Sequence, residues 1–161
     1  MSHAATLDRL EARIAALQDI EVIEALKSRY WRALDRKRPD DVQDCLAPDA
    51  SIDFEGLPRY ESREAFMQMA RQAATAPGTF GMHHGQNPRI TLTGENTAEG
   101  EWDIFYHGID TQAGTLTQMA GAYHDTYRRE NNRWWIATMQ MRIKSLHVQR
   151  AAKTLIFGEA K

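Results

Sequence analysis

The C-terminal half of the chain is the part whose fold the sequence restricts most. From Gly81 onwards, β-branched and aromatic residues recur in four long segments, and short runs of glycine, asparagine, aspartate or glutamate separate them. This pattern predicts four strands joined by tight turns, which is typical of an antiparallel meander. The expected strands are residues 83–93, 98–109, 116–129 and 134–148.

The N-terminal half shows helical spacing instead. Apolar residues recur every three or four positions from Leu7 to Leu17, which predicts a first amphipathic helix. Asp19 is expected to cap a second, longer helix that ends at Asp35. Its apolar side chains fall within one arc, and Trp31 lies four residues before Asp35, so these two side chains share one side of the helix.

One strand and one further helix are expected between these two regions. Ala50, Ile52 and Phe54 alternate with polar residues, as in a half-buried strand, and Ser62 is expected to cap a helix that ends before Pro77. Helices followed by strands predict an α+β fold, with a curved antiparallel sheet wrapped around the N-terminal helices. Such a sheet forms a cone whose open end is an internal pocket.

Composition excludes several classes of partner. The chain has 161 residues, which is one domain by length, and its net charge of −2 gives no reason to expect nucleic acid or an anionic membrane. Residues 1–10 do not read as a signal peptide, and no apolar stretch is long enough to span a bilayer. Cys45 is the single cysteine, so no internal disulfide is possible, which favours a reducing, cytoplasmic location.

His83 and Asp35 are the candidate catalytic pair. A carboxylate that accepts the Nδ1 proton of a histidine leaves Nε2 free to take a proton from a substrate. Both residues also have ordinary interpretations, since most aspartates near a helix end are solvated and a lone histidine is often a surface residue. Tyr30 could give a phenol to a leaving group, although a tyrosine on an apolar arc is more often part of the core.

Two other kinds of site receive less support. Five histidines between residues 83 and 147 could suggest a metal site, but neighbouring strand residues face opposite ways and no HExxH or CxxC spacing occurs. We therefore expect no metal. Cys45 lacks a nucleophile signature and is expected to be buried filler.

Five features of the sequence belong together: the N-terminal helices, Tyr30, the segment 34–37, the strand entry at Pro48 and the pattern His83-x-Gly85-x-Asn87. This combination resembles the SnoaL-like branch of the nuclear transport factor 2-like (cystatin-like cone) superfamily. The pattern is most similar to the scytalone dehydratase-like group, which includes bile acid 7α-dehydratase and hexachlorocyclohexane dehydrochlorinase. The resemblance implies a single domain over residues 1–161, with a core of about 10–148 and a tail of 149–161. It also implies a homotrimer and no cofactor.

The resemblance assigns roles to particular residues. His83 matches the base, Asp35 its partner, and Tyr30 the tyrosine that assists the leaving group. Trp31 is expected to contact the substrate. Either Tyr106 or His107 matches a position on the second long strand that is polar in some members and faces the pocket. A shift of one residue in register would change which of the two points inward. Arg142 matches a basic residue of the last strand.

Three functions remain open on this basis. The first is a cofactor-independent lyase, a dehydratase or related elimination enzyme, acting on a small apolar molecule with a cyclic or aromatic ring. The second is an isomerase or carbon–carbon lyase that uses the same base. The third is a non-catalytic assembly protein similar to the small subunit of ring-hydroxylating dioxygenases, because fold alone does not decide function.

Overall fold

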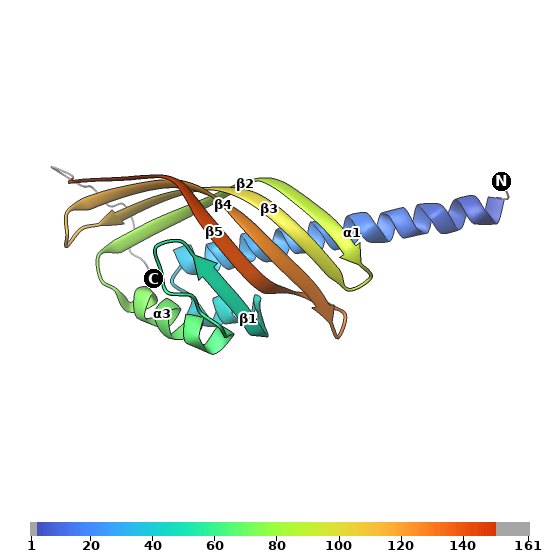
Figure 1. Cartoon of the computed structure of the whole chain (residues 1–161), viewed down its shortest axis with the longest axis horizontal. Coiled ribbons are helices and arrows are strands. Elements are labelled where there is room, and N and C mark those ends of the chain that lie inside the picture. The colour runs from blue at the N-terminus through green and yellow to red at the C-terminus, as the bar shows by residue number, and fades with distance from the viewer. Residues whose placement is uncertain (1–2, 151–161) are drawn as a thin grey trace.

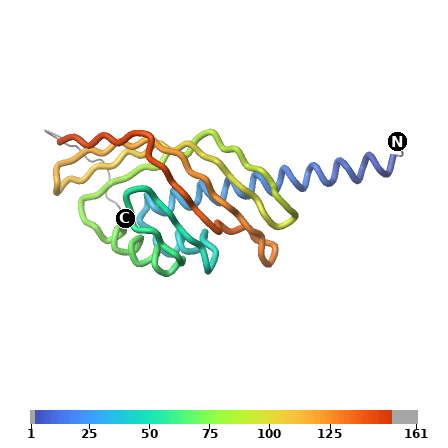
Figure 2. Tube along the Cα trace, viewed as in Figure 1, coloured from blue at the N-terminus to red at the C-terminus, as the bar shows by residue number. Residues whose placement is uncertain are grey.

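Four long strands form one continuous antiparallel meander in the computed structural model, which describes residues 3–150. The sheet is curved and does not close on itself (Figures 1 and 2). The predicted meander is confirmed, and each strand extends beyond its expected ends by one to four residues. The strands are β2 (Thr79–Gly94), β3 (Thr97–Asp110), β4 (Thr115–Glu130) and β5 (Arg133–Arg150).

A fifth strand, β1 (Leu46–Phe54), completes the sheet at the far edge from β2. It runs parallel to β5, so the strand order is β1-β5-β4-β3-β2. Ala50, Ile52 and Phe54 are buried, which confirms the alternation expected from the sequence. The partner of this strand was not predicted, because a parallel neighbour far along the chain leaves no local signal.

The prediction of two N-terminal helices separated at Asp19 is wrong. A single helix, α1 (His3–Asp35), runs through this position. The Asp19 carboxylate accepts hydrogen bonds from Arg129 Nη1 at 2.7 Å and Trp134 Nε1 at 2.8 Å, so it links α1 to the β4–β5 end of the sheet. An aspartate with tertiary partners of this kind has no need to cap a helix, and the local sequence could not distinguish the two roles.

The first part of α1 projects beyond the sheet (Figure 1). The apolar stripe from Leu7 to Leu17 is therefore exposed in the chain by itself, although its spacing is typical of a buried helix face. The second part of α1 crosses the inner face of the sheet, by which we mean the face that carries the hydrophobic core. None of the helices described between residues 3 and 150 has the length and apolar character needed to cross a membrane.

Two short helices complete the described chain. The first is α2 (Pro39–Gln43), and the second is α3 (Arg63–Thr75), which packs against α2 and β1. Ser62 Oγ accepts a hydrogen bond from the Ala65 amide at 3.2 Å, so the predicted cap of α3 is confirmed. In the predicted tail of residues 149–161, Gln149 and Arg150 belong to β5, and the remainder lies outside the described residues.

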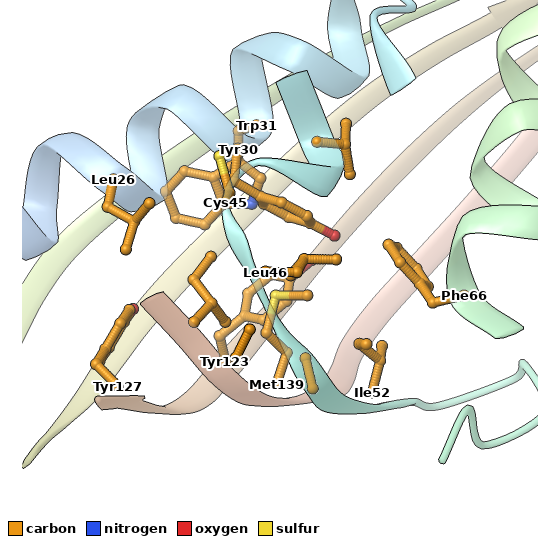
Figure 3. Packing of buried hydrophobic residues seen from close by; sticks show 14 of the residues in the cluster. Leu26, Tyr30, Trp31, Cys45, Leu46, Ile52, Phe66, Tyr123, Tyr127 and Met139 are labelled. Atoms are coloured by element: carbon orange, nitrogen blue, oxygen red, sulfur yellow. The ribbon is translucent and has the colours of Figure 1, made fainter. Parts of the chain in front are cut away.

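The core between α1, α3 and the inner face is rich in aromatic side chains (Figure 3). Trp31 makes edge contacts with Trp102 and Tyr123, with ring centroids 5.3 and 5.9 Å apart. Two charged residues are completely buried in this environment. Lys27 Nζ lies 2.7 Å from Asp125 Oδ2, and both side chains have no exposed surface.

Candidate active site

Asp35 and His83 are in direct contact although they are 48 residues apart in the sequence. Asp35 Oδ1 lies 2.5 Å from His83 Nδ1, and the same carboxylate accepts the backbone N–H of His83, at 3.0 Å for Oδ2. Each side chain is 19% exposed. With Nδ1 bound to a carboxylate, the ring proton belongs on Nδ1, and Nε2 presents its lone pair. Nε2 has no hydrogen-bonding partner among residues 3–150.

The contact depends on a close approach between α1 and β2. Trp31 and Asp35 lie one turn apart on α1, and they pack on Gly85 and His83, which lie two residues apart on the inner face of β2. A Cβ atom at Gly85 would overlap the six-membered ring of Trp31. Glycine at this position therefore allows the helix to lie close enough for Asp35 to reach His83.

Gly85→Ala is accordingly expected to disturb both stability and the Asp35–His83 contact. The added methyl group forces Trp31 or the whole end of α1 to move, and overpacking of this kind costs about 1–3 kcal/mol. Denaturant unfolding gives the stability change, and the NMR signals of the His83 ring report the contact. Trp31→Leu removes the clash, so in a Trp31→Leu background the alanine at position 85 should cost much less stability than it does in the wild type. If Gly85→Ala alone left both quantities unchanged, close packing against Trp31 would not position the pair.

A cavity of about 300 Å³ opens beside the pair. It lies between the end of α1, the two short helices and the first residues of β2. Alanines of α3 form much of one wall, and small apolar side chains leave room for a flat ring. The residues around it are Ala33, Leu34, Asp35, Lys37, Arg38, Pro39, Val42, Ala70, Ala73, Ala74, Ala76, Thr79, Phe80, Gly81, His83 and Tyr106.

Tyr106, and not His107, faces this cavity. Its ring is tilted by 50° to the His83 ring, with centroids 4.8 Å apart. The phenol lies over Gly81 and Gly108, which are paired across β2 and β3, and a Cβ at either position would come within 2.7 Å of the Tyr106 hydroxyl. Burial, helped by the charge of Asp35, raises the pKa of Tyr106, so the phenol keeps its proton and can donate it in a hydrogen bond.

Comparison with known proteins agrees with this architecture. The model of the SnoaL-like domain family matches residues 15–140, which is most of the chain. The chain belongs to this family. Gamma-hexachlorocyclohexane dehydrochlorinase of Sphingobium indicum is 25% identical over 128 residues, which is 80% of this chain and 78% of that protein. Hexachlorocyclohexane dehydrochlorinase 2 of another strain of the same species matches equally well.

Solved structures show the same fold. A type 2 hexachlorocyclohexane dehydrochlorinase aligns with a TM-score of 0.76 at 19% identity, covering 96% of this chain and 99% of the other. A protein of Novosphingobium aromaticivorans, provisionally assigned as a scytalone dehydratase, aligns with a TM-score of 0.75 at 21% identity, covering 84% and 93%. At this level of identity the likeness establishes the fold, and these neighbours have the cone architecture expected from the sequence.

Other expected site residues lie elsewhere in this SnoaL-like domain. Tyr30 is completely buried in the core, where Lys27 Nζ lies 5.3 Å from its ring centroid, and it is not part of the cavity wall (Figure 3). Its hydroxyl has no hydrogen-bonding partner among the described residues, and burial raises the Tyr30 pKa well above its ordinary value. Trp31 also contacts the core and Gly85 instead of the cavity.

Arg142 is remote from the pair. Met141 next to it points into the core, so Arg142 points to the opposite face of the sheet, where its Nη2 pairs with Asp53 Oδ2 at 2.6 Å. The same ion pair lowers the pKa of Asp53. The cavity wall also contains Lys37 and the alanines of α3, which were not predicted to be site residues. The spacing of Ala70, Ala73 and Ala74 along one helix side could have indicated the latter.

Proposed function

We propose that this protein is a cofactor-independent lyase in which His83 is the general base. Its relatives of known name include dehydrochlorinases, which supports elimination chemistry in this part of the SnoaL-like family. The observation that carries the proposal is the 2.5 Å contact between Asp35 Oδ1 and His83 Nδ1 at the wall of a cavity, with Nε2 unoccupied by any residue in the described range.

In the proposed reaction, Nε2 of His83 removes a proton from a carbon of the substrate. The electron pair of that C–H bond forms the new double bond, and the leaving group on the neighbouring carbon departs with the electrons of its own bond. Asp35 stabilises the imidazolium that results. If the leaving group is a hydroxide, it takes up the proton that His83 removed and leaves as water. If it is a halide, it leaves as the anion, and the proton passes from His83 to solvent. A base positioned in this way typically contributes about 10²–10⁴-fold.

Tyr106 is the phenol best situated to assist. Its raised pKa keeps it protonated, and it lines the same cavity as His83, so it can donate a hydrogen bond to a leaving oxygen or to a developing oxyanion. This role was expected of Tyr30 from the resemblance, but a phenol without exposure to the cavity has no route to the substrate. We therefore assign Tyr30 to the core and the donor role to Tyr106.

The substrate is proposed to be a small ring compound that carries a hydroxyl or halogen leaving group. The mostly apolar wall and the volume of about 300 Å³ suit one or two fused rings. Isomerisation or carbon–carbon cleavage would use the same base and differ in the product. The homotrimer implied by the resemblance and the cytoplasmic location expected from the single cysteine stay predictions.

A substrate screen tests the proposal directly. Hydroxylated and halogenated ring compounds are incubated with the protein, and mass spectrometry follows the loss of water or of hydrogen halide. At least one compound should lose such a group with wild-type protein, and His83→Gln should remove that activity. An unchanged mass with a rearranged product would indicate an isomerase, and a smaller carbon skeleton a carbon–carbon lyase. Activity that persists in His83→Gln would refute the role of His83 as base.

A further inference from the structure

Lys37 occupies a backbone position that ordinarily favours glycine. Its φ is +53°, in the left-handed region, two residues after Asp35, where α1 ends. The Lys37 amide donates to Leu34 O at 3.0 Å, and the Arg38 amide donates to Ala33 O at 2.9 Å. This pair of bonds is the Schellman helix end, whose left-handed residue is usually glycine because a Cβ is disfavoured there. A lysine at this position accepts a backbone cost that glycine would avoid, which makes the contacts of its side chain worth following.

The Lys37 side chain turns into the wall of the cavity. Its Nζ donates to the backbone oxygen of Ala76 at 2.8 Å and to Thr79 Oγ1 at 3.1 Å, and all three residues line the cavity beside His83. Both acceptors are neutral, and Lys37 forms no ion pair with any carboxylate in residues 3–150. An ammonium group has three N–H donors, so one remains for a ligand.

The charges around the cavity are unbalanced. The cavity is lined by two cations, Lys37 and Arg38, and by one carboxylate, Asp35. This carboxylate is already hydrogen-bonded to His83. Arg38 contacts Asp41 only at 3.8 Å, with both side chains more than half exposed. A partly buried cation beside apolar walls attracts an anion more strongly than an exposed one, because water screens it less.

We propose that Lys37 binds a carboxylate of the substrate, so that the natural ligand is an anionic ring compound. This inference rests on the proposed function in one respect, namely that the ligand of this cavity is the molecule on which His83 acts. The carboxylate would accept the free N–H of Lys37, and the ring would lie along the alanine wall toward His83 and Tyr106. Lys37 would thereby orient the C–H bond toward Nε2 of His83.

The alternative is that Lys37 only ties the end of α1 to the segment before β2. Two substitutions separate these roles. Lys37→Gly relieves the left-handed strain and removes the side chain, while Lys37→Gln removes the charge and keeps a hydrogen-bonding group. Arg36→Gln is the matched control, because Arg36 is the exposed neighbour and does not line the cavity.

Ligand binding by the full-length protein gives the readout. Benzoate and its neutral isostere benzamide are titrated while NMR follows the ring signals of His83. Benzoate should bind more tightly than benzamide to the wild type and to Arg36→Gln. Its affinity should fall about tenfold in both Lys37→Gln and Lys37→Gly, as expected for a lost charge-assisted hydrogen bond. Benzamide should bind all four proteins equally.

Other results would overturn the inference. Benzoate that fails to bind the wild type, that binds no better than benzamide, or that binds the Lys37 variants as tightly as the wild type would exclude an anion site at Lys37. His83→Gln separates this failure from failure of the lyase proposal. That variant should keep benzoate binding, followed there by the ring signals of Tyr106 in the same cavity, because His83 is not the proposed anion ligand. If the wild type binds benzoate as expected but eliminates nothing from any compound of the screen, the lyase proposal is refuted and the anion site at Lys37 still stands.

Discussion

Asp35→Asn is expected to lower turnover by about 10²–10⁴-fold while the protein stays folded. The Asp35 carboxylate accepts hydrogen bonds from both the backbone N–H and Nδ1 of His83. An asparagine can accept the backbone N–H through its oxygen, but its nitrogen then donates to Nδ1. The ring proton consequently moves to Nε2, where it blocks the lone pair that the reaction needs.

Two measurements check this expectation. Nitrogen-15 chemical shifts of the His83 ring show which nitrogen is protonated, and steady-state kinetics on a compound found by the screen give the loss of turnover. His83→Gln serves as the reference for complete loss of the base. Full activity in Asp35→Asn, or a ring proton that stays on Nδ1, would contradict the pairing as a catalytic device.

Removal of Asp125 alone is expected to have the largest effect on stability, about 3–5 kcal/mol for Asp125→Ala. The reason is that Lys27 would be left as an uncompensated cation in the core, against Met139 Sδ at 3.4 Å and with the Tyr123 ring centroid 3.9 Å from its Nζ. Burial lowers the pKa of Lys27 and raises that of Asp125, and their mutual attraction opposes both shifts. Asp125 also accepts the Tyr127 hydroxyl at 2.9 Å.

The double variant Lys27→Met/Asp125→Leu is the informative control. It removes both charges and keeps apolar volume, and exchanges of this kind are often neutral or stabilising. Denaturant unfolding followed by circular dichroism should therefore show a large loss for Asp125→Ala and a much smaller one for the double variant. A loss below about 1 kcal/mol in the single variant, the scale of an exposed ion pair, would mean that Lys27 finds another partner or reaches water.

The sheet was the part of the fold that sequence reasoning predicted best. Each long strand has its own alternation of apolar and polar residues, and each turn contains residues that favour turns. Asn131 and Asn132 adopt left-handed φ values of 51° and 58° in a two-residue hairpin turn, which asparagine tolerates better than most residues. The continuity of α1 could not be predicted from Asp19, because its partners, Arg129 and Trp134, are more than 100 residues away.

The site shows the same distinction between local and distant information. The nearness of Asp35 and His83 was suggested by resemblance to a family, since no local pattern can join residues 48 positions apart. Their catalytic role stays a prediction. Lys27 was missed, although a signal exists. It lies four residues after Ile23 and three before Tyr30, both completely buried, and therefore within the apolar arc of α1.

The pairing of β1 with β5 has a consequence for how the protein acquires its structure. The edge strand β1 pairs with β5, the last described strand, so during synthesis β1 lacks this partner until residues 133–150 have left the ribosome. Contacts between such distant segments slow folding, because a long loop must close before they form. In a nascent chain, the amide and carbonyl groups of β1 along the edge destined for β5 are therefore open to a strand from another molecule.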